Sequence, residues 1–251
     1  MSSKKVKKKR ADELLIEQGL VASAAEAKSL ILLGLVRSRA DHVVRKTTET
    51  YPADSEMSVD RPSPYVSRGA YKLKTALDEF ASDLTGQVGL DVGASTGGFT
   101  DLMLQTGAKK VYAVDVGTNQ LHYRLRSDER VVSLENTNAR LLTTELIPEA
   151  IDLITSDVSF ISVTKVLPAA AQFLKPGGLA FILVKPQFEV AKADVGDGVI
   201  RDESLRQASL KRVCNFADSE LSWKVLYKKD SPLAGPKGNR EFLVVFQSRQ
   251  G

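Results

Sequence analysis

A glycine-rich stretch at residues 90–101 has the composition of a turn that approaches a ligand closely. An apolar run leads into Gly93, and Gly97 and Gly98 then open a predicted helix. Glycine is needed where the backbone turns tightly or lies against a bound molecule. The dinucleotide fingerprint G-x-G-x-x-G requires glycine where this chain has Ser95, so the backbone lacks the feature that accommodates a pyrophosphate. The stretch therefore indicates a nucleoside ligand without a phosphate group.

A second apolar run ends in Asp115, seventeen residues after Gly98. A carboxylate at the tip of that strand can accept hydrogen bonds from both hydroxyls of a ribose. S-adenosylmethionine fits this pattern, and the alternative is an ordinary α/β turn that binds no nucleotide. The candidate cofactor-binding residues are Asp91, Gly93, Ser95, Gly97, Gly98, Asp115, Asn138 and Asp157.

A second set of polar residues lies at the ends of other apolar runs. Asp157 and Lys185 each close such a run, Glu241 opens the last one, and Lys72 lies on a predicted helix ahead of the first. A lysine that ends an apolar strand is unusual, because burial of an unpaired ammonium group is costly. The ordinary alternatives are a lysine whose tip reaches into water and carboxylates that cap helices.

Composition limits the class of protein. The 251 residues are 43% hydrophobic and 26% charged, as expected for a soluble globular chain of one or two domains. The single Cys214 excludes an internal disulfide and a multi-cysteine zinc site, and it suits a reducing compartment. We expect no bound metal. The sequence contains neither an apolar run long enough to span a membrane nor a secretory signal, so we expect a cytoplasmic protein with no membrane partner.

Positive charge is concentrated near the N-terminus. Residues 1–62 contain 12 Lys and Arg against 9 Asp and Glu, whereas residues 63–251 contain 23 against 22. Six of the first ten residues are basic, which is typical of a segment that binds a phosphate backbone, although a solubilising tail has the same composition. Two prolines and small polar residues at 59–64 predict a boundary between domains 1–62 and 63–251.

The first domain is predicted to be a small α+β module. Helical spacing covers residues 11–19 and 24–34, and Gly19 and Gly34 occupy positions typical of C-terminal helix caps. Ser23 is a predicted N-cap for the second helix, with Glu26 three residues later. Residues 35–38 and 43–46 then indicate a short hairpin.

Strands and helices alternate through the second domain. Apolar runs predict seven strands, at residues 88–92, 111–116, 131–134, 151–156, 179–185, 223–228 and 242–247. Predicted helices at 98–107, 119–126, 162–174 and 202–219 separate most of them, which requires a parallel sheet with helices on both faces. The last two strands are joined without a helix, so one of them should run antiparallel. The fold class is therefore α/β, and this organisation resembles the Rossmann-like class I methyltransferase fold, with its ligand at the carboxyl ends of the strands.

Residues 10–46 resemble the ribosomal-protein S-four-type RNA-binding domain. The matching positions are Arg10, Asp12, Leu14, Gly19, Leu20, Val21, Ser23, Ala27, Leu30, Ile31, Gly34, Leu35 and Val36. The chain departs from the pattern at Ala11, at Ala24, where a basic residue is frequent, and in lacking an Asn-Gly turn. The candidate RNA-binding residues are Lys4, Lys5, Lys7, Lys8, Lys9, Arg10, Arg37, Arg39 and Arg68.

Residues 63–251 resemble the FtsJ-type ribose methyltransferases. The motifs that match are Ser-Arg-(x)3-Lys-Leu at 67–73, Ser-Asp at 156–157, Val-Lys at 184–185 and Arg-Glu at 240–241. The resemblance implies a catalytic Lys-Asp-Lys-Glu tetrad at Lys72, Asp157, Lys185 and Glu241. With the module in front and the motifs Ser-Asp-Val-Ser-Phe-Ile-Ser and Val-Lys-Pro-Gln-Phe-Glu intact, residues 10–247 are similar to the TlyA family, historically named hemolysin A. That similarity implies 2′-O-methylation of cytidine in ribosomal RNA, with S-adenosylmethionine as cofactor and ribosomal subunits as partner.

The implied chemistry leaves the role of Lys185 open. Methyl transfer from a sulfonium is an in-line displacement, in which the enzyme positions a hydroxyl and helps to remove its proton. Lys185 could accept that proton if neutral, a form that the charge of Lys72 favours and the charges of Asp157 and Glu241 oppose. It could instead orient the hydroxyl as a cation. Two alternatives to a methyltransferase remain open. The chain could be an RNA-binding protein whose catalytic site has been lost, or a cytolysin. The sequence does not determine the oligomeric state.

Overall fold

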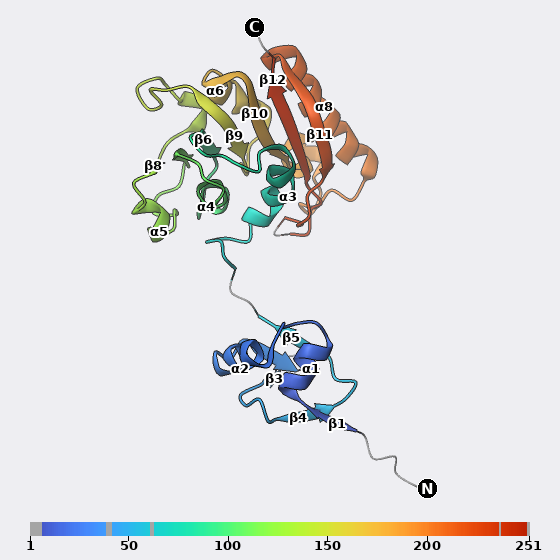
Figure 1. Cartoon of the computed structure of the whole chain (residues 1–251). Coiled ribbons are helices and arrows are strands. Elements are labelled where there is room, and N and C mark those ends of the chain that lie inside the picture. Colours follow the sequence, from blue (N-terminus) through green and yellow to red (C-terminus); the bar gives the residue numbers. More distant parts are fainter. Residues whose placement is uncertain (1–6, 39–41, 61–62, 236, 250–251) are drawn as a thin grey trace. The chain divides into compact units, whose positions relative to one another are not determined.

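The computed structural model describes residues 7–38, 42–60, 63–235 and 237–249. Lys4, Lys5 and Arg39, three of the predicted RNA-binding residues, lie outside these ranges. The chain consists of two compact units, Met1–Pro64 and Tyr65–Gly251, which divide two residues beyond the expected boundary (Figure 1). Each unit has its own apolar core.

The N-terminal unit packs two helices against short strands. Its helices are α1 (Ala11–Glu17) and α2 (Ala24–Leu32), and its strands are β1 (Lys8–Arg10), β2 (Val36–Ser38), β3 (His42–Val43), β4 (Thr50–Pro52) and β5 (Met57–Val59). The predicted hairpin is confirmed, because β2 and β3 pair antiparallel with Arg37 opposite Val43. Strand β5 pairs with the other edge of β2, and β1 pairs with β4. These three additional strands have three residues each, too few to produce a readable alternation.

The predicted helix ends of this unit are confirmed. Ser23 caps α2 by accepting a hydrogen bond from the Glu26 N–H at 3.2 Å. Gly19 and Gly34 follow the two helices with φ of +67° and +71°. Glycine is favoured at these positions because the left-handed conformation carries a steric penalty for residues with a Cβ atom.

The C-terminal unit is built on a seven-stranded sheet in the order β11-β12-β10-β9-β6-β7-β8. The strands are β6 (Val88–Val92), β7 (Lys110–Val114), β8 (Val131–Leu134), β9 (Ile151–Ser156), β10 (Leu174–Val184), β11 (Trp223–Asp230) and β12 (Phe242–Ser248). Strand β12 is antiparallel to both neighbours, and the other strands run in one direction. The prediction of one antiparallel strand in the final pair is therefore confirmed. Strand order reverses direction between β6 and β9, the point at which ligands bind in such sheets.

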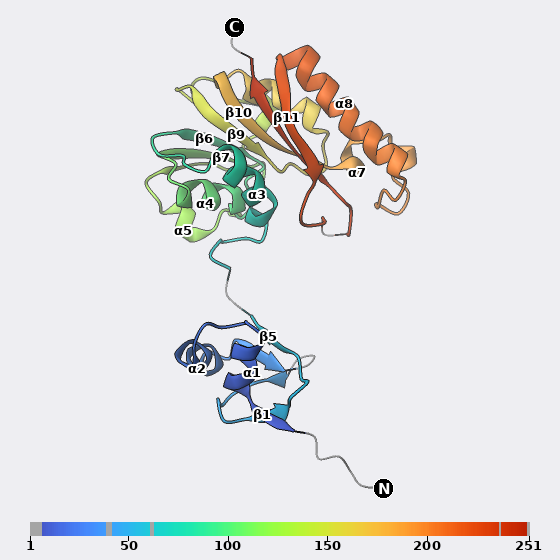
Figure 2. The ribbon, with the colours of Figure 1, turned by 45° about the vertical axis from the view of Figure 1, so that its right-hand side comes forward.

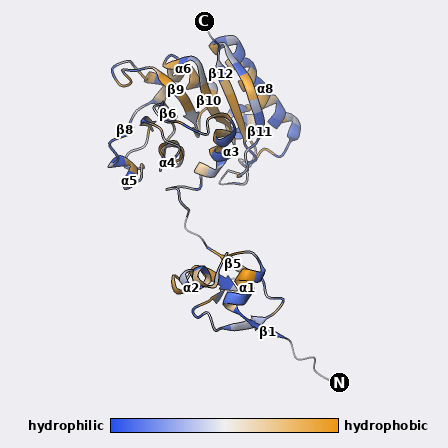
Figure 3. Cartoon of the chain, in the orientation of Figure 1, coloured by the Kyte–Doolittle hydropathy of each residue, from blue (hydrophilic) through white to orange (hydrophobic). Residues whose placement is uncertain are grey.

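Helices cover both faces of this sheet. They are α3 (Ala70–Phe80), α4 (Gly98–Gln105), α5 (Tyr123–Arg126), α6 (Leu167–Ala171), α7 (Pro186–Glu189) and α8 (Glu203–Leu221). Leu153 of β9 packs in the core with α3 and α4, whereas the next residue, Ile154, packs in the core with α6 and α8. This alternation explains why β9 has apolar residues at successive positions, and Figure 2 shows α3 and α4 opposite α8. In Figure 3 the strands are largely hydrophobic and the outer side of α8 is largely polar.

Two predicted helices of this unit are wrong in extent. The helix expected at 119–126 contains only Tyr123–Arg126, because Asn119 has φ of +56° and the N–H groups of Gln120 and Leu121 donate to the Glu135 carboxylate. The helix expected at 162–174 divides into a 3-10 turn, η2 (Val163–Lys165), and the short α6. Strand β10 begins five residues earlier than expected, with an irregularity between Leu174 and Leu179. No helix in the described part of the chain is long and apolar enough to cross a membrane.

Candidate active site

Sheet topology brings the four predicted catalytic residues together at the carboxyl ends of β9 and β10. Asp157 and Lys185 directly follow β9 and β10, which are parallel and therefore end on the same side. Strand β12 is antiparallel to β10, with Phe242 opposite Val184, so Glu241 stands at that side although it precedes its strand. Lys72 reaches the group from α3.

The four charges alternate in sign and form a connected chain. Lys72 Nζ lies 2.7 Å from Glu241 Oε2 and 3.6 Å from Asp157 Oδ2. Lys185 Nζ forms an ion pair with Asp157 Oδ1 at 2.6 Å. Glu241 is 1% exposed, Lys185 7% and Lys72 9%. Buried side chains can remain charged when they are paired in this way. The four residues therefore form a buried ionic cluster, not a set of separate surface charges.

Electrostatics keep Lys72 in its charged form. Burial alone would lower its pKa, but the negative charges of Asp157 and Glu241 outweigh that effect and raise the pKa above its ordinary value. Gly235 packs closely against the other side of the Glu241 carboxylate. A residue with a Cβ atom would not fit in its place, because that atom would lie 2.5 Å from Glu241 Oε1. Among the described residues, this Oε1 is one of the few buried side-chain atoms without a hydrogen-bond partner.

Lys185 also contacts the loop that follows β9. Its ammonium donates to Ser159 Oγ at 2.8 Å and to the backbone carbonyl of Asp157 at 3.4 Å. Ser159 was not among the predicted residues. The motif Ser-Asp-Val-Ser was visible in the sequence, but only the folded loop shows that its second serine faces the lysine.

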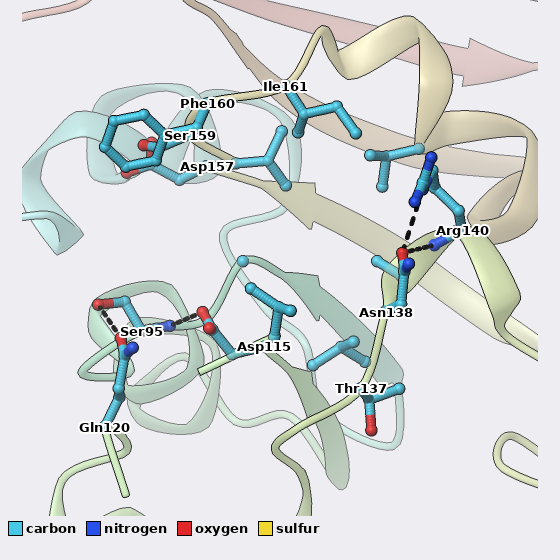
Figure 4. Close-up of a pocket in the computed structure, with 16 residues that line it drawn as sticks. Ser95, Asp115, Gln120, Thr137, Asn138, Arg140, Asp157, Ser159, Phe160 and Ile161 are labelled. Atoms are coloured by element: carbon cyan, nitrogen blue, oxygen red, sulfur yellow. Dashed lines mark hydrogen bonds between the residues drawn. The ribbon is translucent and has the colours of Figure 1, made fainter. Parts of the chain in front are cut away.

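A pocket of about 490 Å³ lies beside this cluster at the carboxyl ends of β6, β7 and β9. Asp115 lines it, as predicted, and Asp115 Oδ2 and Oδ1 accept hydrogen bonds from the N–H groups of Ser95 at 2.8 Å and Gly117 at 2.7 Å. Each carboxylate oxygen has two acceptor positions, so each retains one. Asp115 can therefore receive two ribose hydroxyls while it holds the loop. Figure 4 shows Ser95, Asp115 and Gln120 across the pocket from Asp157, Ser159 and Phe160.

The glycine loop makes the predicted tight turn, and Gly93 and Gly98 line the pockets. Gly93 and Gly97 have φ of +83° and +93°. A Cβ atom at Gly97 would lie 2.2 Å from the Leu125 side chain, so only glycine fits there. Ser95 also adopts a left-handed conformation, with φ of +48°. Its N–H bond to Asp115 supports that conformation, which is uncommon for a residue with a Cβ atom.

Asp91 holds the floor of the site together. It is 1% exposed and accepts hydrogen bonds from the N–H and the hydroxyl of Thr100 at 2.9 and 2.7 Å, and from Thr155 Oγ1 at 2.9 Å. Burial raises the pKa of Asp91 to about 6 against the opposing effect of these bonds. Its hydrogen bonds join the first turn of α4 to β9, so Asp91 fixes the start of the helix that follows the glycine loop. Asp91 also lines a second, smaller pocket.

This second pocket, of about 220 Å³, is lined by three of the four cluster residues, whereas Glu241 is buried behind Lys72 and lines neither pocket. Lys72, Asp157 and Lys185 line it, together with Gly98 and Asp91. It shares four lining residues with the larger pocket, namely Gly93, Ser95, Asp157 and Ser159. The site therefore has two lobes, and Asp157 lies where they meet.

The far end of the large lobe contains Asn138, as predicted. Asn138 Oδ1 accepts from the N–H of Arg140 at 3.1 Å and from Arg140 Nε at 3.3 Å. Arg140 and Gln120 also line the pocket and were not predicted. Phe160, another unpredicted lining residue, is 91% exposed and has φ of +66°.

Three of the predicted RNA-binding residues form ion pairs with carboxylates of the N-terminal unit. Lys9 pairs with Glu17, Arg10 forms a two-point contact with Asp12, and Arg37 pairs with Asp60. These three cations are therefore partly neutralised within the N-terminal unit. The exposed ones that remain in the described ranges are Lys7 and Lys8, with Arg68 exposed at the start of the C-terminal unit.

Comparison with known proteins agrees with this geometry. Residues 65–248 match the FtsJ-like methyltransferase family. A 16S/23S rRNA (cytidine-2′-O)-methyltransferase TlyA of Mycobacterium tuberculosis is 44% identical over 242 residues, which cover 96% of this chain and 90% of that protein. Hemolysin A of Brachyspira hyodysenteriae is 41% identical over 242 residues, covering 94% and 99% of the two chains.

A solved structure resembles both units. It is described as a "Putative hemolysin" from Streptococcus thermophilus, has 40% sequence identity and a TM-score of 0.72, and covers 97% of this chain and 90% of its own. The matches extend over nearly the whole chain in sequence and in structure. The chain therefore belongs to the FtsJ-like methyltransferase family and, within it, to the TlyA family.

Proposed function

We propose that this protein transfers the methyl group of S-adenosylmethionine to the ribose 2′-hydroxyl of a cytidine in ribosomal RNA. The observation that carries the proposal is the charged cluster at the small lobe, where Lys72 and Lys185 flank Asp157 at the junction of the two lobes and the buried Glu241 pairs with Lys72. One lobe has the lining and size for a nucleoside, and the other exposes amine and carboxylate groups to a reacting hydroxyl. The TlyA relative named above acts on cytidine 2′-hydroxyls, which supports this choice of substrate.

The residues of the large lobe fit the cofactor. Asp115 would hold the ribose hydroxyls through the acceptor positions that Ser95 and Gly117 leave open, and Asn138 would lie beside the adenine. Gly93, with Asp157 at the junction, would bring the methionine end toward the small lobe. When bound, S-adenosylmethionine supplies an electrophilic methyl group.

The charged cluster would prepare the hydroxyl for attack. Lys185 lies against Asp157 and Ser159, so its ammonium position is set before substrate arrives. As a neutral amine it would receive the hydroxyl proton, and as an ammonium it would instead hold the hydroxyl in line by charge. Lys72, kept positive by Asp157 and Glu241, would anchor Asp157 in place for either role.

RNA would be held by a group at the mouth of the pocket and by basic groups outside it. Phe160 is an exposed aromatic ring at the pocket and offers a face on which an unstacked base can lie. We propose that the N-terminal unit, through Lys7 and Lys8, adds sequence-independent phosphate contacts, with Arg68 doing so beside the site. Ribosomal subunits in the cytoplasm would then be the substrate.

The test is direct methylation of defined RNA. Purified protein is incubated with labelled S-adenosylmethionine and either ribosomal subunits or free rRNA from cells that lack the gene. The modified nucleotides are then mapped for 2′-O-methylation. Label at a cytidine 2′-oxygen supports the proposal, label on a base contradicts the assigned position, and binding without transfer favours a non-catalytic RNA-binding role.

A further inference from the structure

Glu189 is a buried carboxylate outside the predicted catalytic and cofactor-binding sets. Its side chain is 1% exposed, and it ends α7, the single turn that follows Lys185. Within this turn the Phe188 N–H donates to the Lys185 carbonyl at 2.9 Å and the Val190 N–H to the Pro186 carbonyl at 3.0 Å. One rigid turn therefore sets the distance between Lys185 and Glu189.

The Glu189 carboxylate holds the far end of the loop that begins at Asp157. Ser162 Oγ donates to Glu189 Oε2 at 2.6 Å, and the Val163 N–H donates to Oε1 at 2.7 Å. Arg212 of α8 adds a third contact, at 2.7 Å. At the near end of the loop, the Asp157 N–H donates to the Val92 carbonyl at 3.1 Å. Residues 157–163 are thus fixed at both ends.

Between these two ends lie the groups that face Lys185. Ser159 accepts its hydrogen bond, and the next residue, Phe160, has φ of +66°. A left-handed aromatic residue is strained and keeps this conformation only where its surroundings hold it. The Phe160 and Phe188 rings lie 5.3 Å apart, so the loop and the α7 turn also touch through side chains. Release of the far end would let the loop relax and move Ser159 and Asp157 relative to the lysine.

We propose that Glu189 is a positioning residue for methyl transfer, which keeps the loop of Asp157 and Ser159 in register with the turn of Lys185. The inference rests on the proposed function. Glu189 does not touch the reacting atoms; it acts through Ser162 and Val163 on one side and α7 on the other. Its loss should therefore slow the chemical step more than it weakens cofactor binding.

The test compares full-length Glu189→Ala, Glu189→Gln and Asp152→Ala in single-turnover methylation of ribosomal subunits at saturating S-adenosylmethionine. Asp152 is a matched control, because it also accepts a backbone N–H, from Val88 at 2.8 Å, and pairs with a partly exposed cation, Lys175, at 2.6 Å. It lies near the start of β9, whereas Asp157 follows the other end of that strand. Cofactor Kd and thermal unfolding are measured for each variant.

We expect the Glu189→Ala rate to fall more than fivefold, with a smaller change in cofactor Kd. Glu189→Gln keeps an acceptor for Val163 and should restore most of the rate, and Asp152→Ala should stay within twofold of wild type. A fall of less than fivefold, no rescue by glutamine, or an equal fall in Asp152→Ala would overturn the inference. If Glu189→Ala does not fold, Ser162→Ala takes its place with a threefold threshold. Wild-type protein that binds cofactor but transfers no methyl group would overturn the proposed function instead.

Discussion

Lys72 and Glu241, 169 positions apart in the chain, form a buried ion pair with 2.7 Å between Nζ and Oε2. The pair joins α3, which precedes the first strand of the sheet, to the start of β12, which is the last. It also completes the cluster around Asp157. A substitution at either residue is therefore expected to change both the free energy of unfolding and the rate of methyl transfer. The two quantities must be measured separately.

Glu241→Ala should weaken both stability and transfer. Removal of one partner of a buried pair leaves the other charge uncompensated, at a cost of about 3 kcal/mol of unfolding free energy. Urea unfolding measures this cost, and single-turnover methylation measures the chemistry. The double variant Lys72→Met, Glu241→Leu should recover stability but not transfer. If that double variant methylates rRNA at the wild-type rate, neither residue belongs to the machinery.

Lys185→Arg distinguishes the two roles of this lysine. Arginine keeps the positive charge but stays protonated in proteins, so it cannot accept the hydroxyl proton. Lys185→Ala should abolish methylation while cofactor binding stays near wild type. If the lysine acts as a neutral base, Lys185→Arg should be equally inactive, whereas an orienting charge should leave measurable activity. Single-turnover assays of both variants decide the role, and full activity in Lys185→Ala would remove this residue from the mechanism.

Asp115→Ala should weaken the binding of S-adenosylmethionine. Hydrogen bonds to a charged group contribute about 1.5–3 kcal/mol, which corresponds to roughly a ten- to hundredfold increase in Kd. Calorimetric titration measures this change. Asp115→Asn keeps one acceptor oxygen and should have an intermediate effect. Unchanged affinity in the alanine variant would show that the ribose lies elsewhere.

Asp91 should make folding stability depend on pH. Its folded pKa of about 6 lies above the ordinary value of 3.8, so the native state binds the proton more tightly than the unfolded state. Its favourable contribution is complete below pH 3.8 and is lost as the pH rises through 6. Relative to Asp91→Asn, wild-type protein should lose on the order of 2 kcal/mol between pH 4 and pH 7. Urea unfolding of both proteins across this range measures the difference, and a constant difference would mean that the carboxylate stays ionised.

Lys7 and Lys8 should contribute to the salt dependence of RNA binding. Each phosphate contact releases about one counterion, so the double variant Lys7→Gln, Lys8→Gln should reduce the slope of log K against log salt by roughly 1–2. Lys110→Gln is the control, because Lys110 pairs with Glu149 at the start of β7, away from the site. Filter binding of rRNA at several salt concentrations gives the slopes. Equal slopes in all three proteins would exclude direct contacts by Lys7 and Lys8.

Much of the sheet and its polar end could be predicted because the central strands are largely buried on both faces. Such strands are rich in apolar residues, and β6 and β9 begin and end at the predicted residues, as does the partly buried β8. Asp115, Asp157 and Lys185 directly follow β7, β9 and β10, and they come together at one end of the sheet as parallel topology requires. The same reasoning fails for β5, whose three residues are too few for a pattern.

The unpredicted parts depend on contacts between distant segments. Ser159 and Glu189 lie where the loop of residues 157–163 contacts Lys185 and the α7 turn. Neither segment has a periodic sequence from which this contact could be predicted. The basic N-terminal segment was interpreted from composition alone. Composition does not show that Lys9 and Arg10 already have the carboxylate partners Glu17 and Asp12.

The place of β12 in the sheet has a consequence for the order of assembly. This strand is the last of the sheet along the chain, yet it lies between β10 and β11, both of which are synthesised before it. Until residues 242–248 leave the ribosome, β10 and β11 each lack their shared neighbour, and Glu241 has no strand to fix it beside Lys72. The residues that line the large lobe around Asp115 all precede residue 167, so they are synthesised well before that point. A nascent chain should thus acquire cofactor binding first and methyl transfer only after its final strand inserts, so an unfinished chain stays catalytically silent.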